Sequence, residues 1–387
     1  MKRIYSIDIT RGLIMIIMAL DHVRDLMHIK SDTQSPTDLA TTTPVLFFTR
    51  WITYLCAPIF VFLAGTSAFL SFKNKSEISL SRKFLLTRGL WLVLLEFTIV
   101  NFGLFFDLGF HTLLFEVIAA IGFGFIILSL LLKLSPRTVG LIGLIILFCH
   151  DLMRIFPFGQ GSIVNDIISP FFSMGAFQVL SNRNLIIAYP PVPWLGIMLV
   201  GFASGKLFEL TEDKRKKIFL KIGAGGILLF VLLRLINIYG DPVRWSFQKT
   251  SVYTFLSFMN ITKYPPSLLF CLVTLGIMFL MLAVAERGKN RFTDIANIYG
   301  KVPLFYFIIH FYIIHSLLII LLFSQGFHWA DLKFSSGAFG RPKGVENGVS
   351  LGVVYLIWIA VVAALYKPCS WFGKYKAGHK DWWLSYL

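Results

Sequence analysis

The 387-residue sequence has few charged residues, and its acidic residues are outnumbered by basic ones. Only 14% of the residues are charged, whereas 56% are hydrophobic, 39 are phenylalanine, and the mean hydropathy is +0.74. A soluble domain of this length would need far more polar surface. The composition therefore excludes a soluble protein and predicts a polytopic membrane protein.

Cysteine is also scarce: Cys56, Cys149, Cys271 and Cys369 form neither a CxxC pair nor a metal-like spacing. This distribution excludes a disulfide framework and a zinc site, so no metal is predicted. The sequence has no GxSxG, Walker or HExxH motif, which excludes the hydrolase, nucleotide-binding and metalloprotease sites that those motifs build. The chemistry must therefore be of a kind that a histidine and a bound activated donor can carry out.

The net charge of +16 does not indicate a nucleic-acid partner. Lysines and arginines lie in short loops between apolar runs, such as KNKSEISLSRK and KLFELTEDKRKK, where the positive-inside rule explains them. The N-terminal apolar run carries Arg11 and lacks a small-residue cleavage site. It therefore predicts a retained first helix and not a signal peptide.

Runs of about 20 apolar residues predict an all-α fold with ten membrane-spanning helices. The predicted spans are 4–28, 44–72, 84–105, 111–132, 137–150, 188–208, 216–239, 264–285, 298–323 and 347–367. Lysine-rich loops fall on alternate sides of ten spans, which places both termini in the cytoplasm and residues 30–43, 240–263 and 324–348 outside. No linker divides the chain, so residues 1–387 are predicted to form one transmembrane domain.

Residues 151–187 are apolar but interrupted by Pro157, Gly159, Gly161 and Pro170. The segment is compatible with an interfacial helix, a re-entrant piece or an eleventh span. Only the first two preserve the alternation of the charged loops.

The first predicted helix carries an unusual set of polar residues for a membrane span. Arg11 and His22 are eleven residues apart, so they share one stripe of the helix with their heads about 16 Å apart. Asp25 is three residues from His22 and from His28, so its carboxylate can reach either imidazole and fix its tautomer for general base catalysis. The alternative is that these charges cap the helix at the membrane interface.

Other predicted spans contain polar residues for which the sequence leaves more than one role. His310 and His315 are about 140° apart around a helix, so they cannot hold a metal together; His310 is predicted to make a structural hydrogen bond or to contact the substrate. Glu96 is predicted to pair with Arg234 or Arg50. Two spans begin with the similar pieces YPPVPWLG and KYPPSLLF. These pieces predict either that proline caps the start of each helix or that the two helix ends face the substrate.

The first-helix pattern of Arg11, ten residues and His22 resembles that of membrane acyltransferase family three. The longer pieces SIDITRGLIMIIMALDHVRD, DLATTTPVLFFTRWITYLCAPIFVFLAGTSAF, YPPVPWLG and GKVPLFYFIIHFYIIH more closely resemble bacterial relatives of heparan-α-glucosaminide N-acetyltransferase, over residues 4–366. This resemblance implies an acyltransferase of the bacterial inner membrane that moves acetyl from cytoplasmic acetyl-CoA to an amino or hydroxyl group of a sugar-containing acceptor outside. The alternative is a proton-coupled transporter of a small polar solute, which would use the same residues as a proton relay.

The resemblance and the spacing together suggest roles for individual residues. His22 is the predicted general base or acyl carrier, Asp25 its orienting partner and His28 the competing candidate. The predicted donor-binding residues are Arg11, Arg82, Arg88 and Lys301. The predicted acceptor-binding residues are Asp21, Arg24, Arg50, Tyr189, Trp194, Tyr264, His310 and His315. The predicted partners are membrane lipid, a small-molecule or glycan acceptor and a second copy of the chain in a homodimer.

Overall fold

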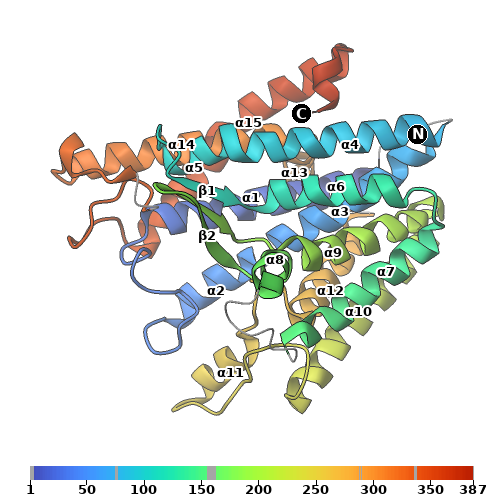
Figure 1. Cartoon of the computed structure of the whole chain (residues 1–387), viewed down its shortest axis with the longest axis horizontal. Coiled ribbons are helices and arrows are strands. Elements are labelled where there is room, and N and C mark those ends of the chain that lie inside the picture. The colour runs from blue at the N-terminus through green and yellow to red at the C-terminus, as the bar shows by residue number, and fades with distance from the viewer. Residues whose placement is uncertain are drawn as a thin grey trace.

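A computed structural model describes residues 4–74, 77–154, 163–286, 288, 290–334 and 338–386 (Figure 1). The protein is mostly helical, at 71%, and within the described residues seven helical segments are long and apolar enough to cross a membrane. These segments are α2 with α3 (Pro44–Thr53, Cys56–Lys73), α4 with η1 and α5 (Ile78–Leu95, Glu96–Val100, Asn101–Phe105), α9 with η3 (Pro191–Ser204, Gly205–Glu209), α10 (Glu212–Ile236), α12 (Leu268–Ala285), α14 (Pro303–Ser324) and α15 (Leu351–Gly378). They account for seven of the ten predicted spans.

The other three predicted spans are helices of a different kind. α1 (Tyr5–Met27) is 23 residues long but carries five charged side chains, Asp8, Arg11, Asp21, Arg24 and Asp25. α6 (Val117–Leu131) and α7 (Pro136–Cys149) have 15 and 14 residues, fewer than the about 20 that a spanning helix needs. The predicted span at 111–132 also begins differently, because Thr112–Phe115 form strand β1.

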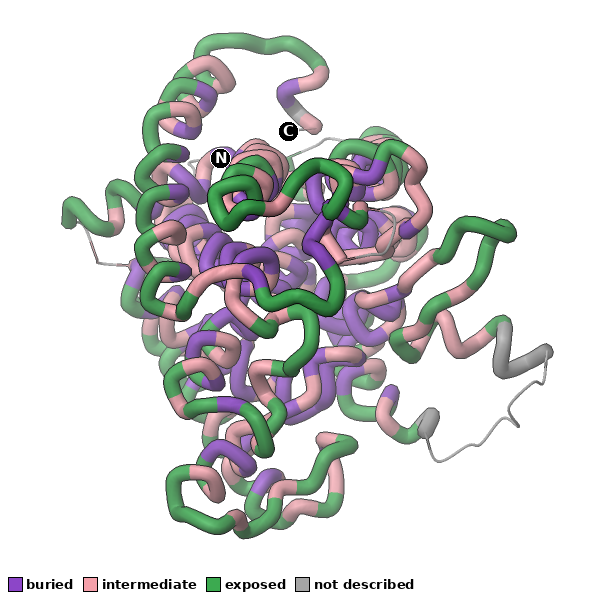
Figure 2. The backbone as a smooth tube through the Cα atoms, turned by 90° about the vertical axis from the view of Figure 1, so that its left-hand side faces the viewer, coloured by how far each residue is buried: buried purple, intermediate pink, exposed green. Residues whose placement is uncertain are grey.

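Helix α1 lies inside the bundle, where it contacts α3, α12, α13 (Arg291–Gly300), α14 and α15. Figure 2 shows buried backbone through the middle of the molecule and exposed backbone around it. α1 and α13 cross closely: a Cβ at Gly12 would lie 1.7 Å from the Ala296 carbonyl oxygen, and one at Gly300 1.8 Å from that of Asp8. This contact holds the charged residues of α1 against neighbouring helices and away from the outer surface.

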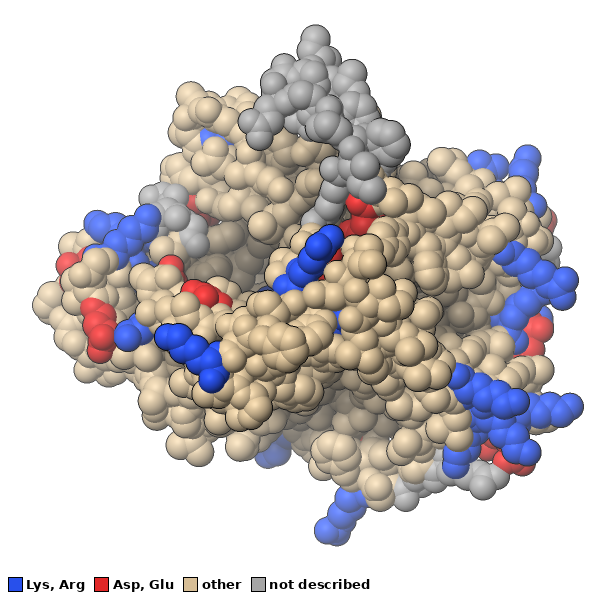
Figure 3. Space-filling view, turned by 90° about the horizontal axis from the view of Figure 1, so that it is seen from below, with Lys and Arg blue, Asp and Glu red and all other residues tan. Residues whose placement is uncertain are grey.

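The outer surface of the helices is apolar where a lipid-facing surface is expected. α10 and α15 expose a series of large aliphatic side chains, Leu228, Leu232, Leu235, Leu356 and Ile359. Figure 3 shows Lys and Arg side chains gathered most densely at the end of the molecule that carries the N-terminus in Figure 1, beside broad uncharged surface. This distribution fits an integral membrane protein.

Of the three alternatives for residues 151–187, the eleventh membrane span is wrong for the described part of the segment. Residues 163–187 fold as a short helix and a hairpin. α8 (Ile163–Phe172) has only ten residues and is followed by β2 (Gly175–Leu180) and β3 (Arg183–Ile187). The sheet order is β1-β3-β2, with β1 parallel and β2 antiparallel to β3. Phe115 pairs with Ile187, so Glu116 and Tyr189 leave the sheet at the same edge. Pro157, Gly159 and Gly161 lie outside the described residues.

Shorter elements complete the fold outside the long helices. They are η2 (His150–Arg154), α11 (Ser251–Met259), η4 (Trp329–Asp331) and η6 (Trp382–Ser385). Arg234 near the end of α10 donates to the carbonyls of Val243, Ser257, Phe258 and Asn260, which ties the segment from 240 to 263 to the helix.

Candidate functional site

Two cavities lie along α1, one near each end. The first has a volume of about 560 Å³ and is lined by the basic residues Arg11, Arg88, Lys301 and Lys376 and by apolar residues that include Met15 and Phe307. We call it the basic cavity. Arg11 donates to Ser67 Oγ at 3.0 Å and to the Gly300 carbonyl at 3.4 Å, and it lies 3.5 Å from Asp8. These contacts hold the guanidinium at the cavity wall.

The second cavity has a volume of about 260 Å³, and we call it the histidine cavity. His22 from α1 lines it together with Phe311 from α14. Its other polar lining residues are Asp21, Asp25, Arg50, Glu116, Tyr189, Lys263 and Tyr264. These residues come from helices and from the segments between them, so the cavity exists only in the folded bundle.

The two cavities adjoin each other at two places. Phe307 lines the basic cavity and Phe311 the histidine cavity, and their ring centroids are 5.2 Å apart on successive turns of α14. Glu116 lines the histidine cavity and the next residue, Val117, lines the basic cavity. The two cavities therefore have neighbouring walls.

His22 makes a hydrogen bond that decides which of its ring nitrogens carries the proton. Its Nδ1 lies 2.6 Å from Nε2 of His310, whose Nδ1 lies 3.1 Å from the Tyr306 carbonyl oxygen. A carbonyl only accepts, so neutral His310 carries its proton on Nδ1 and its Nε2 accepts from Nδ1–H of His22. This leaves Nε2 of His22 with a free lone pair, as a general base requires. The ring of His22 also stacks on Phe311 at 4.3 Å.

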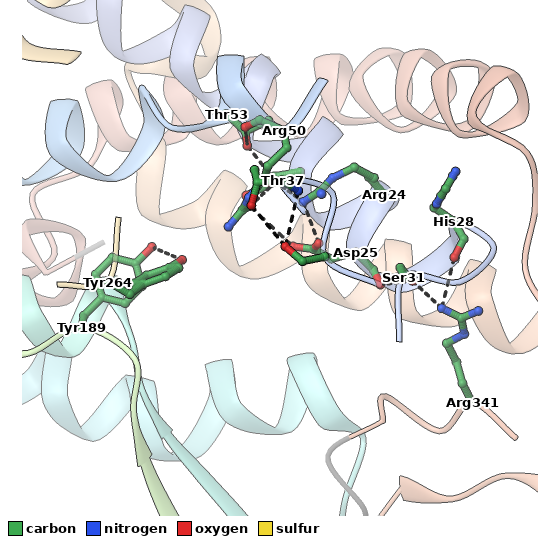
Figure 4. Close-up of polar contacts among 12 residues, drawn as sticks. Arg24, Asp25, His28, Ser31, Thr37, Arg50, Thr53, Tyr189, Tyr264 and Arg341 are labelled. Atoms are coloured by element: carbon green, nitrogen blue, oxygen red, sulfur yellow. Dashed lines mark hydrogen bonds and ion pairs between the residues drawn. The ribbon is translucent and has the colours of Figure 1, made fainter. Parts of the chain in front are cut away.

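A buried carboxylate network lies beside His22. Asp21 accepts from Arg24 at 2.6 Å, from Arg50 at 2.6 and 2.7 Å to its two oxygens, and from Thr53 at 2.8 Å. Asp25 accepts from Arg24 at 2.6 Å (Figure 4). The two arginines neutralise the carboxylates and hold the end of α1 against α2.

Comparison with family models places the chain in a known family. Residues 3–235 match the model described as heparan-alpha-glucosaminide N-acetyltransferase, catalytic. The chain belongs to this family. The match confirms the resemblance to heparan-α-glucosaminide N-acetyltransferase that the longer sequence pieces indicated, and membership implies a transmembrane acetyltransferase. A comparison with curated proteins finds no match to the chain.

In this family member, three of the four predicted donor-binding residues lie together. Arg11, Arg88 and Lys301 line the basic cavity, whereas Arg82 is not among its lining residues. Lys376 takes part instead, because α15 continues to Gly378, beyond the predicted end of its span at 367. The sequence pointed to Lys376 only as one of the charges of the lysine-rich tail.

The structure separates the two candidate histidines. His28 ends α1, donates its backbone N–H to the Arg24 carbonyl, and offers its own carbonyl to Arg341 at 3.3 Å. Figure 4 shows its ring pointing away from Asp25. His28 is absent from the described lining of the histidine cavity, so His22 is the histidine that the fold brings to the site.

The predicted role of Asp25 as the orienting partner of His22 is not supported by the hydrogen bonds. Asp25 bonds to Arg24, and in the described part of the chain no hydrogen bond joins it to either histidine. The strong attraction of the neighbouring guanidinium explains this choice. His310, predicted to make a structural hydrogen bond or to contact the substrate, makes the hydrogen bond to His22 instead.

The predicted acceptor residues divide into three groups. Asp21, Arg50, Tyr189 and Tyr264 line the histidine cavity, and the two tyrosine hydroxyls are 3.4 Å apart. Arg24, Trp194 and His310 lie behind that lining, where Trp194 is fully buried against Tyr189 at 4.7 Å between ring centroids. His315 lies outside both cavities, stacked on Phe106 at 3.9 Å.

The predicted ion pair of Glu96 is wrong. Glu96 accepts from the backbone N–H of Ala119 at 2.8 Å, in the first turn of α6, where a helix N-terminus favours a carboxylate. Arg234 bonds to backbone carbonyls and Arg50 to Asp21. Two polar residues of the histidine cavity were not assigned to the site from the sequence: Glu116, within a predicted span, and Lys263, which opens the piece KYPPSLLF. Among the residues described, no group of three His, Cys, Asp or Glu side chains could hold a metal ion.

Proposed function

We propose that the protein transfers an acetyl group from acetyl-CoA in the basic cavity to an amino group of a sugar-containing acceptor in the histidine cavity. The observation that carries the proposal is the position of His22, which lines one cavity beside the wall of the other with its Nδ1 engaged by His310. Family membership supports acetyl transfer, and the family in general uses acetyl-CoA as donor.

In the proposed reaction His22 is the base that acts on the attacking nitrogen, and no step requires a metal. The acceptor nitrogen attacks the thioester carbonyl carbon, a C–N bond forms and the C–S bond breaks. Nε2 of His22 accepts the proton that leaves the nitrogen and passes it to the departing thiolate, which gives an amide and free CoA. A hydroxyl acceptor would react through the same steps.

The basic cavity has the composition that CoA requires. Arginine and lysine bind phosphate oxygens, and Arg11 and Arg88 offer the paired donors that suit them best. The apolar walls of the same cavity suit the pantetheine arm, which carries the thioester toward His22. The Arg11 to His22 separation of about 16 Å expected along α1 matches that arm in scale.

The proposed function is tested directly by incubating the purified protein with acetyl-CoA and glucosamine and measuring free CoA and N-acetylglucosamine. Acetyl-CoA is also expected to raise the melting temperature, because a ligand present at 100 times its Kd stabilises the native state by about 2.7 kcal/mol. A protein that releases no product with any amine or hydroxyl acceptor and shows no thermal shift contradicts the proposal and favours the transporter.

Arg11 provides the sharpest test of the donor site. Arg11→Ala is expected to weaken CoA binding about 10- to 150-fold, since a charge-assisted hydrogen bond contributes about 1.5–3 kcal/mol, while binding of pantetheine, which lacks the nucleotide phosphates, stays unchanged. Arg11→Lys should also weaken CoA binding, because lysine cannot bind phosphate in the same paired way. Equal losses for CoA and pantetheine, with a lower melting temperature, would assign Arg11 a structural role through Asp8 and Gly300.

The proposal includes a membrane orientation, with both termini and the lysine-rich loops in the cytoplasm of a bacterial cell and the histidine cavity reached from outside. Single cysteines at Gln34 and Lys343, in a background that lacks the four native cysteines, are expected to react with an impermeant maleimide in intact spheroplasts. Lys214→Cys should react only after lysis. All three positions are exposed, so labelling reports sidedness. Labelling of Lys214→Cys from outside would overturn this orientation.

A further inference from the structure

The charged residues around the histidine cavity are not all paired. Asp21 pairs with Arg24 and Arg50, and Asp25 pairs with Arg24. Two opposite charges that line the same cavity, Glu116 and Lys263, take no part in these pairs.

Glu116 offers an unused acceptor. Its Oε2 is buried and has no hydrogen-bond partner among the described residues. Glu116 precedes α6 as its N-cap residue, but its side chain does not cap the helix, because Glu96 accepts from the N–H of Ala119 there. A buried carboxylate oxygen without a donor is unfavourable, and a ligand that brings an N–H group would remove that cost.

Lys263 is the corresponding cation, and no ion pair holds it among the described residues. Its side chain is almost fully buried, and its Nζ lies 4.9 Å from the ring centre of Tyr264, 5.9 Å from that of Tyr189 and 6.0 Å from that of Tyr54. Within the part of the chain that the structure describes, no carboxylate lies within 4.0 Å of this ammonium. Three aromatic rings replace part of the lost hydration, but a buried cation is stabilised most by an anion.

We infer that Glu116 and Lys263 select an acceptor that carries both an ammonium and an acidic group, such as an amino sugar bearing a sulfate, phosphate or carboxylate. The ammonium pairs with Glu116, at the edge of the cavity next to the donor, and the acidic group pairs with Lys263 beneath the tyrosines. This inference rests on the proposed function, since it names the acceptor of that reaction. It explains why, among the described residues, Glu116 and Lys263 form no ion pair when Asp21, Asp25, Arg24 and Arg50 do.

The pairing also prepares the amine for attack. One ammonium proton moves to the Glu116 carboxylate, so that an N–H bond breaks, an O–H bond forms, and the nitrogen gains a lone pair. His22 then accepts the second proton as the C–N bond forms and the C–S bond breaks.

The test compares kcat/KM for three acceptors that carry the same amine. Glucosamine has no acidic group, whereas glucosamine 6-sulfate and glucosamine 6-phosphate each have one. The wild-type protein is expected to prefer at least one acidic acceptor by tenfold or more. Lys263→Met should lower this preference by about 10- to 100-fold, and Lys263→Arg should keep most of it. Glu116→Gln should lower kcat/KM for all three acceptors by a similar factor, because an amide cannot pair with an ammonium as an anion does.

Matched controls are Glu346→Gln and Lys343→Met, which remove the same charges from an exposed outer loop. Melting temperature and acetyl-CoA affinity report whether each variant folds. A wild-type protein without preference for an acidic acceptor, or a Lys263→Met protein with the preference intact, overturns the inference while the proposed function stands. If no amine is acetylated, the proposed function fails; calorimetric binding of glucosamine 6-sulfate to the wild type, Glu116→Gln and Lys263→Met then decides the inference separately.

Discussion

His22→Ala is expected to lower the rate of acetyl transfer about 100- to 10,000-fold, the usual cost of removing a general base, and to leave acetyl-CoA binding unchanged. The affinity persists because the cations proposed to hold the nucleotide line the other cavity. The change should be measured as kcat with saturating acetyl-CoA and as the Kd for CoA. The variant is also expected to lose about 1–3 kcal/mol of stability, because Nε2 of His310 loses its donor inside the bundle.

His28→Ala provides the comparison for this experiment. His28 ends the same helix but is not among the described residues that line the histidine cavity, so its replacement should leave kcat within a few-fold of the wild type. If His28→Ala abolishes transfer and His22→Ala does not, the assignment of the base to His22 is wrong. A comparable loss in both variants would point to damage at the end of α1.

Seven spans were predictable because each is a long apolar run, and such a run by itself indicates a helix that crosses the membrane. The failures lie where composition and fold disagree. Residues 112–115 lie in a predicted membrane span and 175–187 in a segment for which an eleventh span was one alternative, but β1, β2 and β3 satisfy one another's backbone groups in a small sheet. No local sequence pattern predicts this strand pairing, because β1 and β3 are far apart in the sequence and meet only in the folded chain.

The same distinction separates the parts of the site that could be predicted. Arg11 and His22 were assignable because both lie on α1, where the helical repeat fixes their relation. The spacing of Asp25 allows its carboxylate to reach His22. Spacing does not show which other donors compete for that carboxylate, and Arg24 binds it at 2.6 Å. His310 meets His22 across 288 residues of sequence. Lys263 and Glu116 likewise come together only through the packing of distant segments.

His310→Ala is expected to lower kcat by at least about tenfold, up to the about 10,000-fold seen when a catalytic histidine loses its orienting partner, with little change in the Kd for CoA. The reason is the hydrogen bond of 2.6 Å that keeps the proton of His22 on Nδ1 and the lone pair on Nε2. Without it the ring can rotate, and the tautomer with Nε2 protonated cannot accept the acceptor proton. In the proposed mechanism His310 acts as a positioning residue, so kcat is expected to fall without a matching change in KM.

Two further variants separate positioning from a general effect on folding. His310→Gln should recover part of the lost kcat, since its side-chain carbonyl can accept from Nδ1–H of His22. His315→Gln is the matched control, because His315 is also fully buried on α14, five residues further along, and its Nδ1 bonds to the Leu104 carbonyl outside both cavities. It should lower the melting temperature yet keep kcat per folded molecule. An unchanged kcat in His310→Ala, or an equal loss of kcat in His315→Gln, would show that His310 does not take part in the mechanism. Another group would then have to fix the tautomer of His22.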